Sequence, residues 1–186
     1  RAMQQAMESK DCKGIKLENG RVKNFVMNDK CAAGTGRFLE VISEALGVRL
    51  QDIGGLSLHF KNRVKISSTC TVFAEQEVVS HITNGVAIED ILAGIHESIA
   101  VRVYNMVERI KVERDVVLTG GGAKNIGLVR ALEEKLGCPV LVPEEPLLTG
   151  ALGAAILGRD MAEQAIKRGQ PLPRRERRLE EATFFT

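Results

Sequence analysis

The last third of the chain constrains the fold most, because short apolar runs alternate there with helical patterns. Residues 116–119 read as a buried strand, and three consecutive glycines separate them from a helical pattern over residues 125–136, which Gly137 is expected to end. A second apolar run covers residues 138–142, and a Gly/Ala-rich stretch typical of a closely packed helix covers residues 147–168. Strand, glycine turn, helix, strand and helix in this order predict an α/β fold with parallel strand pairing.

The first two thirds predict a hairpin followed by mainly helical structure. Asn19-Gly20 separates two β-prone runs within residues 14–27, which is the strongest short signal for a two-residue hairpin. Apolar residues then recur at helical spacing in three segments, which are residues 37–46, 73–83 and 88–110. Residues 48–64 read as irregular structure or as a short helix with loops.

Composition favours one globular domain and excludes several function classes. We expect residues 1–168 to form a single domain, followed by a charged tail over residues 169–186. A net charge of +2, one Tyr and no Trp make nucleic acid an unlikely partner. No apolar run approaches the roughly 20 residues of a membrane span, and the start has no signal-peptide pattern. The expected location is the cytoplasm.

Four cysteines are too few for a disulfide scaffold in a chain of 186 residues, and no CxxC pair indicates a common zinc site. Cys31 and Cys70 each precede small or hydroxyl residues and then a helical pattern. A thiol near a helix N-terminus is favoured as the thiolate, so metal, redox and cluster chemistry are all open to these two residues. Cys138 reads as a buried structural thiol, and the role of Cys12 stays open.

The glycine turn, Gly120-Gly121-Gly122, permits positive φ and lets a ligand approach the backbone. The helix N-terminus behind it would favour an anion or a nucleotide. The segment is not a Walker A loop, because no Gly-Lys-Ser or Gly-Lys-Thr follows, and it is not GxGxxG, because Asn125 stands where the third glycine would be. On these residues alone, a nucleotide site and a tight turn without a ligand are equally good interpretations.

Two histidines have simpler interpretations. Glu77 and His81 lie one helical turn apart and could share a metal, but an ordinary surface contact is favoured for such a pair. His96 is expected to need no role beyond packing or solvation.

Three segments in order carry a resemblance to a known family: NDKCAAGTGRFL at residues 28–39, CTVFAE at 70–75 and LTGGGA at 118–123. Together they resemble the activator (component A) family of 2-hydroxyacyl-CoA dehydratases, to which the ATPase subunits of benzoyl-CoA reductases also belong. The similarity extends from Asp11 to about Arg159. It implies a ribonuclease H-like lobe of the actin, Hsp70 and sugar-kinase ATPase fold, with the N-terminal lobe largely missing from this chain.

The same resemblance implies a homodimer bridged by one [4Fe–4S] cluster, with Cys31 and Cys70 as its ligands within a cluster-binding segment, residues 28–84. Two thiolates from each of two chains agree with the four that such a cluster needs. ATP hydrolysis would drive one electron to an acyl-CoA dehydratase or benzoyl-CoA reductase-type acceptor, and the electron would come from a donor such as ferredoxin or flavodoxin. The adenosine-binding segment would be residues 116–159.

Within that segment the residues expected closest to ATP or ADP, bound with Mg²⁺, are Gly120, Gly121, Gly122, Ala123 and Asn125. A second phosphate loop of the family, Asp-Ile-Gly-Gly-Gln-Asp with a lysine two residues later, aligns near the start of the chain. Asp11 and Lys13 match it, which makes Asp11 the candidate catalytic residue, but Glu8 and Ser9 replace the paired glycines. A glutamate there opposes phosphate binding electrostatically.

Two other functions stay open beside ATP-driven electron transfer. One is an ATP-binding kinase-like or regulatory domain with structural or zinc-binding cysteines. The other is an inactive fragment that keeps the cluster.

Overall fold

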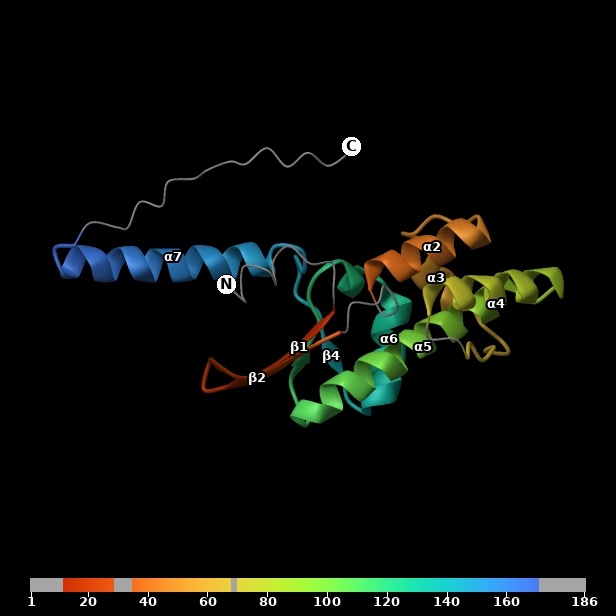
Figure 1. The fold of residues 1–186 in the computed structure, drawn as a ribbon, viewed down its shortest axis with the longest axis horizontal. Coiled ribbons are helices and arrows are strands. Elements are labelled where there is room, and N and C mark those ends of the chain that lie inside the picture. The colour runs from red at the N-terminus through yellow and green to blue at the C-terminus, as the bar shows by residue number, and fades with distance from the viewer. Residues whose placement is uncertain (1–11, 29–34, 68–69, 171–186) are drawn as a thin grey trace. The chain divides into compact units, whose positions relative to one another are not determined.

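The computed structural model describes residues 12–28, 35–67 and 70–170, and Figure 1 traces their helices and strands. The chain divides into two compact units, with the boundary between Thr149 and Gly150. The single domain expected over residues 1–168 therefore stays a prediction.

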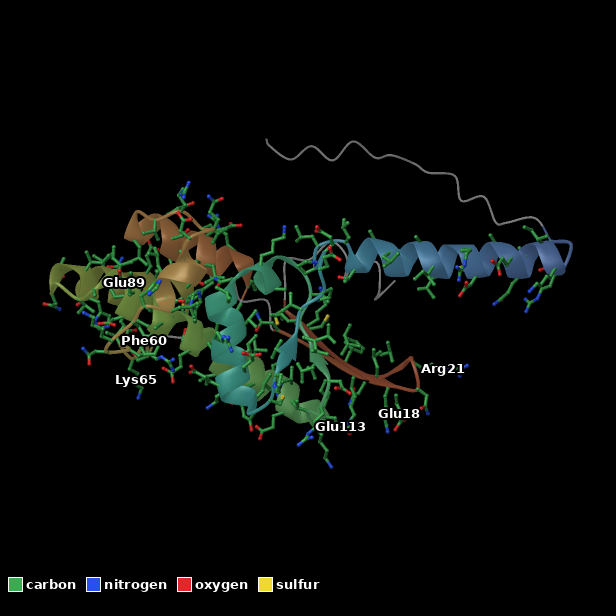
Figure 2. All side chains as sticks on the ribbon, turned by 180° about the vertical axis from the view of Figure 1, so that it is seen from behind. Glu18, Arg21, Phe60, Lys65, Glu89 and Glu113 are labelled. Atoms are coloured by element: carbon green, nitrogen blue, oxygen red, sulfur yellow. The ribbon has the colours of Figure 1, made fainter. Side chains whose placement is uncertain are left out.

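The predicted hairpin is confirmed. Strand β1 (Lys13–Glu18) pairs antiparallel with β2 (Arg21–Met27), and Figure 2 labels Glu18 and Arg21 on either side of the turn. Asn19 and Gly20 both have positive φ, 52° and 73°, the combination whose twist matches that of the flanking strands. β1 is held to the rest of the first unit at Lys16, whose Nζ lies 2.5 Å from Glu113 Oε1.

Helix α5 (Ile88–Val107) is the centre of the first unit. It packs against α3 (Ile53–Ser57) and α6 (Ile126–Leu136), while α2 (Gly36–Leu46) packs against α4 (Thr71–Thr83). Every residue from Asp90 to His96 is buried. The helix expected over residues 88–110 is confirmed, and neighbouring helices pack against α5; the last turn, η1 (Glu108–Ile110), is 3₁₀.

The parallel pairing predicted for the last third is confirmed. β3 (Val116–Val117) pairs with β4 (Val140–Leu141), and α6 connects them. Between β3 and α6 lies η2 (Gly121–Lys124), a single 3₁₀ turn that contains most of the glycine segment. Gly137 ends α6 in the left-handed conformation, with φ of 68°, as its position predicts.

Helix α7 (Thr149–Lys167) differs from its prediction. The Gly/Ala-rich pattern predicts close packing, yet no residue of α7 is buried among the described residues. Its largest apolar side chains are exposed instead: Leu152, Ile156, Leu157, Met161 and Ile166. The expectation is wrong here because small and apolar residues permit close packing but do not supply a partner.

No described helix is both long and apolar enough to cross a membrane.

Candidate nucleotide and cluster site

The glycine turn presents open backbone. Gly120 has φ of 84° and ψ of −171°, a conformation essentially restricted to glycine, and its N–H donates to the Pro146 carbonyl at 2.8 Å. A Cβ atom added at Gly120 or Gly121 would meet no atom within 4 Å. Within the turn, the N–H of Ala123 donates to the Gly120 carbonyl at 3.2 Å. The turn therefore lets another molecule approach the backbone, as the sequence predicted.

Asn125 joins this turn to α6. Its backbone N–H donates to the Gly122 carbonyl at 3.1 Å, and its side-chain Oδ1 accepts from Leu128 N–H at 3.0 Å. The second bond is an N-terminal cap, the usual role of asparagine at this position. Asn125 thus has a structural role in addition to the nucleotide contact expected of it.

Sequence reasoning missed the residues behind Asn125. His96 on α5 is 1% exposed, and its Nε2 lies 3.0 Å from Asn125 Nδ2 while its Nδ1 lies 2.9 Å from Ser57 Oγ. Burial lowers the pKa of His96 to about 4, so the ring is neutral near pH 7. The partners of His96 are 39 and 29 residues away in the chain, and no spacing pattern could have indicated them.

Cys70 is the N-cap residue of α4 and is half-buried. The first turn of α4 contains no acidic side chain. Thr71, the next residue, has a buried Oγ1 with no hydrogen-bond partner among the described residues. Val72 and Phe73, the next two residues, are exposed.

These features fit a cluster ligand at Cys70. The thiol lies at the N-terminus of α4, a hydroxyl is carried by the following residue, and exposed apolar side chains come next, where a second protein surface could pack. Cys31 lies outside the described residues, and α2, which begins at Gly36, packs against α4. Within residues 12–28, 35–67 and 70–170 no group of three or more His, Cys, Asp or Glu side chains could hold a metal ion.

Asp11, the candidate catalytic residue, also lies outside the described residues. Glu77 takes the surface role favoured for it, since both its carboxylate oxygens accept from Ser67 N–H, at 2.9 and 3.1 Å. That contact ties α4 to the segment that leads to Cys70.

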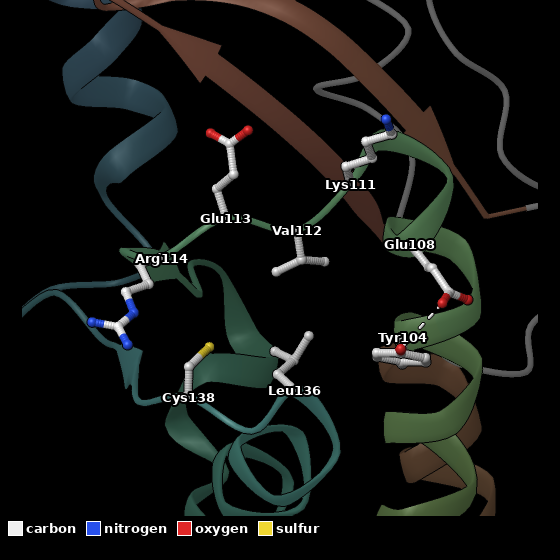
Figure 3. Close-up of a pocket in the computed structure, with 8 residues that line it drawn as sticks. All are labelled: Tyr104, Glu108, Lys111, Val112, Glu113, Arg114, Leu136 and Cys138. Atoms are coloured by element: carbon white, nitrogen blue, oxygen red, sulfur yellow. Dashed lines mark hydrogen bonds between the residues drawn. The ribbon is translucent and has the colours of Figure 1, made fainter.

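Cys138 differs from its predicted role as a buried thiol, because it is half-buried and lines a pocket of about 390 Å³ (Figure 3). Figure 3 places Arg114 and Leu136 beside it and the Tyr104–Glu108 hydrogen bond on the opposite wall. The pocket has acidic, basic and apolar walls, and this mixture does not select one class of ligand. Its neighbours Gly137 and Pro139 are exposed, so the chain lies at the surface here before Val140 enters the core.

Comparison with known proteins gives a consistent result. Residues 9–158 match the BadF/BadG/BcrA/BcrD ATPase family. The 2-hydroxyisocaproyl-CoA dehydratase activator of Clostridioides difficile is 52% identical over 158 residues, 84% of this chain and 59% of that protein. The (R)-2-hydroxyglutaryl-CoA dehydratase activating ATPase of Acidaminococcus fermentans is 51% identical over 146 residues, 78% of this chain and 56% of that protein. A benzoyl-CoA reductase subunit of Thauera aromatica is 36% identical, over 82% of this chain and 56% of that protein.

Two solved structures resemble the chain closely. The Clostridium difficile activator with bound ADPNP superimposes with a TM-score of 0.82 at 50% identity, covering 89% of this chain and 62% of that one. Component A of the Acidaminococcus fermentans dehydratase gives a TM-score of 0.78 at 50% identity, covering 80% of this chain and 57% of that one. This chain therefore spans less than two thirds of these relatives. The family resemblance read from the cysteine and glycine segments is confirmed, and the chain belongs to the BadF/BadG/BcrA/BcrD ATPase family.

Proposed function

We propose that this chain acts in ATP-dependent, one-electron activation of an acyl-CoA dehydratase. The observation that carries the proposal is the position of Cys70 in a chain of this family: a half-buried thiol at the N-terminus of α4, followed in sequence by Thr71, whose buried hydroxyl has no partner among the described residues. Cys70 and Cys31 would supply two ligands of a [4Fe–4S] cluster, and a second copy would supply the other two. The cluster, when bound, accepts and donates one electron.

The nucleotide half of the proposal rests on the glycine turn. ATP or ADP with Mg²⁺ would lie against Gly120, Gly121 and Gly122, with Ala123 and Asn125 completing the contact. The open backbone at Gly120 and Gly121 supports this, and so does the relative solved with bound ADPNP. Asp11 would position Mg²⁺ or water. The lobe that carries this turn would have the ribonuclease H-like fold of the actin, Hsp70 and sugar-kinase ATPases.

The class of acceptor follows from the order of similarity. Three relatives whose names refer to 2-hydroxyacyl-CoA or lactoyl-CoA dehydratases are 48–52% identical to this chain, whereas the benzoyl-CoA reductase subunit is 36% identical. We therefore propose a dehydratase as the acceptor rather than a reductase. Its electron would come from a donor such as ferredoxin or flavodoxin, in a reducing compartment such as the cytoplasm, which keeps both thiols reduced.

Metal analysis after anaerobic purification and reconstitution tests the cluster. One [4Fe–4S] cluster per two chains requires about two iron and two sulfide atoms per chain. Cys70→Ala should abolish the bound iron. Cys138→Ala is the matched control, since that thiol is also half-buried but lines a pocket to which Cys70 does not contribute, and it should leave the iron content unchanged.

A colourless, iron-free protein after reconstitution would refute electron transfer. Zinc at about half an equivalent per chain would instead support the second candidate, a regulatory ATP-binding domain with zinc-binding cysteines. Calorimetric titration with Mg²⁺-ADP then tests the nucleotide half separately. Iron without ADP binding would support a cluster-bearing chain that does not bind nucleotide by itself.

A further inference from the structure

Four residues from three helices form a continuous hydrogen-bonded chain behind the glycine turn. Asn125 Nδ2 contacts His96 Nε2 at 3.0 Å, His96 Nδ1 contacts Ser57 Oγ at 2.9 Å, and Ser57 Oγ donates to the Gly54 carbonyl at 2.8 Å. Ser57 and His96 are buried, with 3% and 1% exposure. We call this chain the Asn125–Gly54 relay.

The direction of each hydrogen bond in the relay is determined by its ends. Asn125 Oδ1 must accept from Leu128 N–H to cap α6, which leaves the Nδ2 amide to donate toward His96. His96 Nε2 must therefore accept, so the ring proton lies on Nδ1 and is donated to Ser57 Oγ. The Ser57 hydroxyl then donates to Gly54. Every donor in the relay has an acceptor only when His96 is neutral, and its pKa of about 4 keeps it neutral.

Two glycines enclose the relay tightly. A Cβ atom added at Gly54 would lie 2.6 Å from Asn125 Oδ1, and one added at Gly127 would lie 2.7 Å from His96 Nδ1. Both distances are shorter than real Cβ contacts. The side chains of the relay therefore have almost no freedom to rearrange if one hydrogen bond is lost.

We propose that His96 is a positioning residue for the nucleotide: through Asn125 it holds the glycine turn in the conformation that binds ADP or ATP. Asn125 is the link, because its side chain is the end of the relay while its backbone N–H donates to Gly122 of the turn. His96 contacts Asn125, the residue expected to contact the nucleotide, and needs no contact with the nucleotide itself. The proposal rests on the proposed nucleotide site.

Two substitutions test the hydrogen bonds of the two ring nitrogens of His96 separately. In His96→Gln the side-chain oxygen can still accept from Asn125 Nδ2, while the bond to Ser57 is lost. In His96→Asn the amide can still donate to Ser57, while Asn125 Nδ2 loses its acceptor. Both variants bury one amide in place of one imidazole, so a merely structural role for His96 predicts similar losses from both.

The first measurement needs no nucleotide. Amide hydrogen exchange of the unliganded 186-residue chain should be about tenfold faster over residues 121–128 in His96→Asn than in His96→Gln, because only the former loses the Asn125 bond. Amides in α2, which contributes no residue to the relay, serve as the internal control. Equal exchange over residues 121–128 in the two variants would overturn the proposal.

The second measurement is calorimetric titration with Mg²⁺-ADP. We expect His96→Asn to weaken binding by about tenfold and His96→Gln to stay within about threefold of the unchanged chain, since one lost bond corresponds to about a factor of ten. Equal losses in both variants would overturn the proposal. If the unchanged chain binds no ADP, the proposed nucleotide site fails, whereas the exchange measurement still decides whether His96 holds the turn.

Discussion

Protonation of His96 should make the stability of this protein depend on pH. The side chain is 1% exposed, and burial lowers its pKa from 6.5 in the unfolded chain to about 4 in the folded protein. The unfolded chain therefore binds a proton more readily than the folded protein between these two values. Its contribution to stability is complete above pH 6.5 and is lost as the pH falls toward 4.

The size of the effect follows from the shift. Each pKa unit corresponds to about 1.4 kcal/mol, so a shift from 6.5 to about 4 is worth about 3 kcal/mol, of which about 2 kcal/mol is lost by pH 5. That is a large fraction of the roughly 5–15 kcal/mol by which a domain is typically stable. The geometry gives a second reason for the loss, because an imidazolium would direct an N–H at the Asn125 amide.

Urea denaturation between pH 7.5 and pH 5 measures this effect. The unchanged chain should lose about 2 kcal/mol more free energy of unfolding over that range than His96→Gln, which has no titrating ring. Ser57→Ala is the matched control, because it removes a partner but keeps the buried histidine, and it should keep the steep pH dependence. Equal pH dependence in the unchanged chain and in His96→Gln would refute the reasoning.

Two further predictions concern the packing of α5. A Cβ atom at Gly94 would collide with the Val64 carbonyl oxygen, so Gly94→Ala should lower the free energy of unfolding by about 1–3 kcal/mol in urea denaturation. Gly55→Ala is the control, because its added Cβ meets nothing within 4 Å, and it should be neutral or stabilising by up to about 1 kcal/mol. Equal effects of the two substitutions on the free energy of unfolding would contradict the packing described for α5. Asp90 Oδ1 accepts from the backbone N–H groups of Lys61 and Asn62 at 2.7 and 2.9 Å, so Asp90→Ala should cost about 1–3 kcal/mol by thermal denaturation. Asp90→Asn keeps an acceptor oxygen and should cost less, and the reverse order would argue against this role.

Local signals in the sequence were enough to predict the elements whose turns or ends they mark. Asn19-Gly20 indicated the hairpin because two successive residues with positive φ fit its turn, and Gly137 indicated the end of α6 for a similar reason. The parallel pairing of β3 and β4 followed from the intervening helix. These features depend on residues that are close in the sequence, where backbone geometry determines the outcome.

Features that depend on distant residues could not be read in this way. His96 looked like an ordinary helix residue because Ser57 and Asn125, which give it a defined tautomer, come from other helices. The exposure of α7 was missed because composition says nothing about whether a partner covers a face. At the candidate site, the positions of Cys70 and Gly120 were anticipated from the helix and turn around them, whereas the contacts behind Asn125 were not.

We propose that Cys70 and Cys31 form half of a cluster site shared by two copies of this chain. Native mass spectrometry of the anaerobically reconstituted protein tests it most directly, because it reports the number of chains and the bound iron and sulfide together. The account predicts one species with the mass of two chains plus one [4Fe–4S] cluster, and its loss in Cys70→Ala but not in Cys138→Ala. A complete cluster bound to a single chain, or a cluster that survives Cys70→Ala, would contradict it.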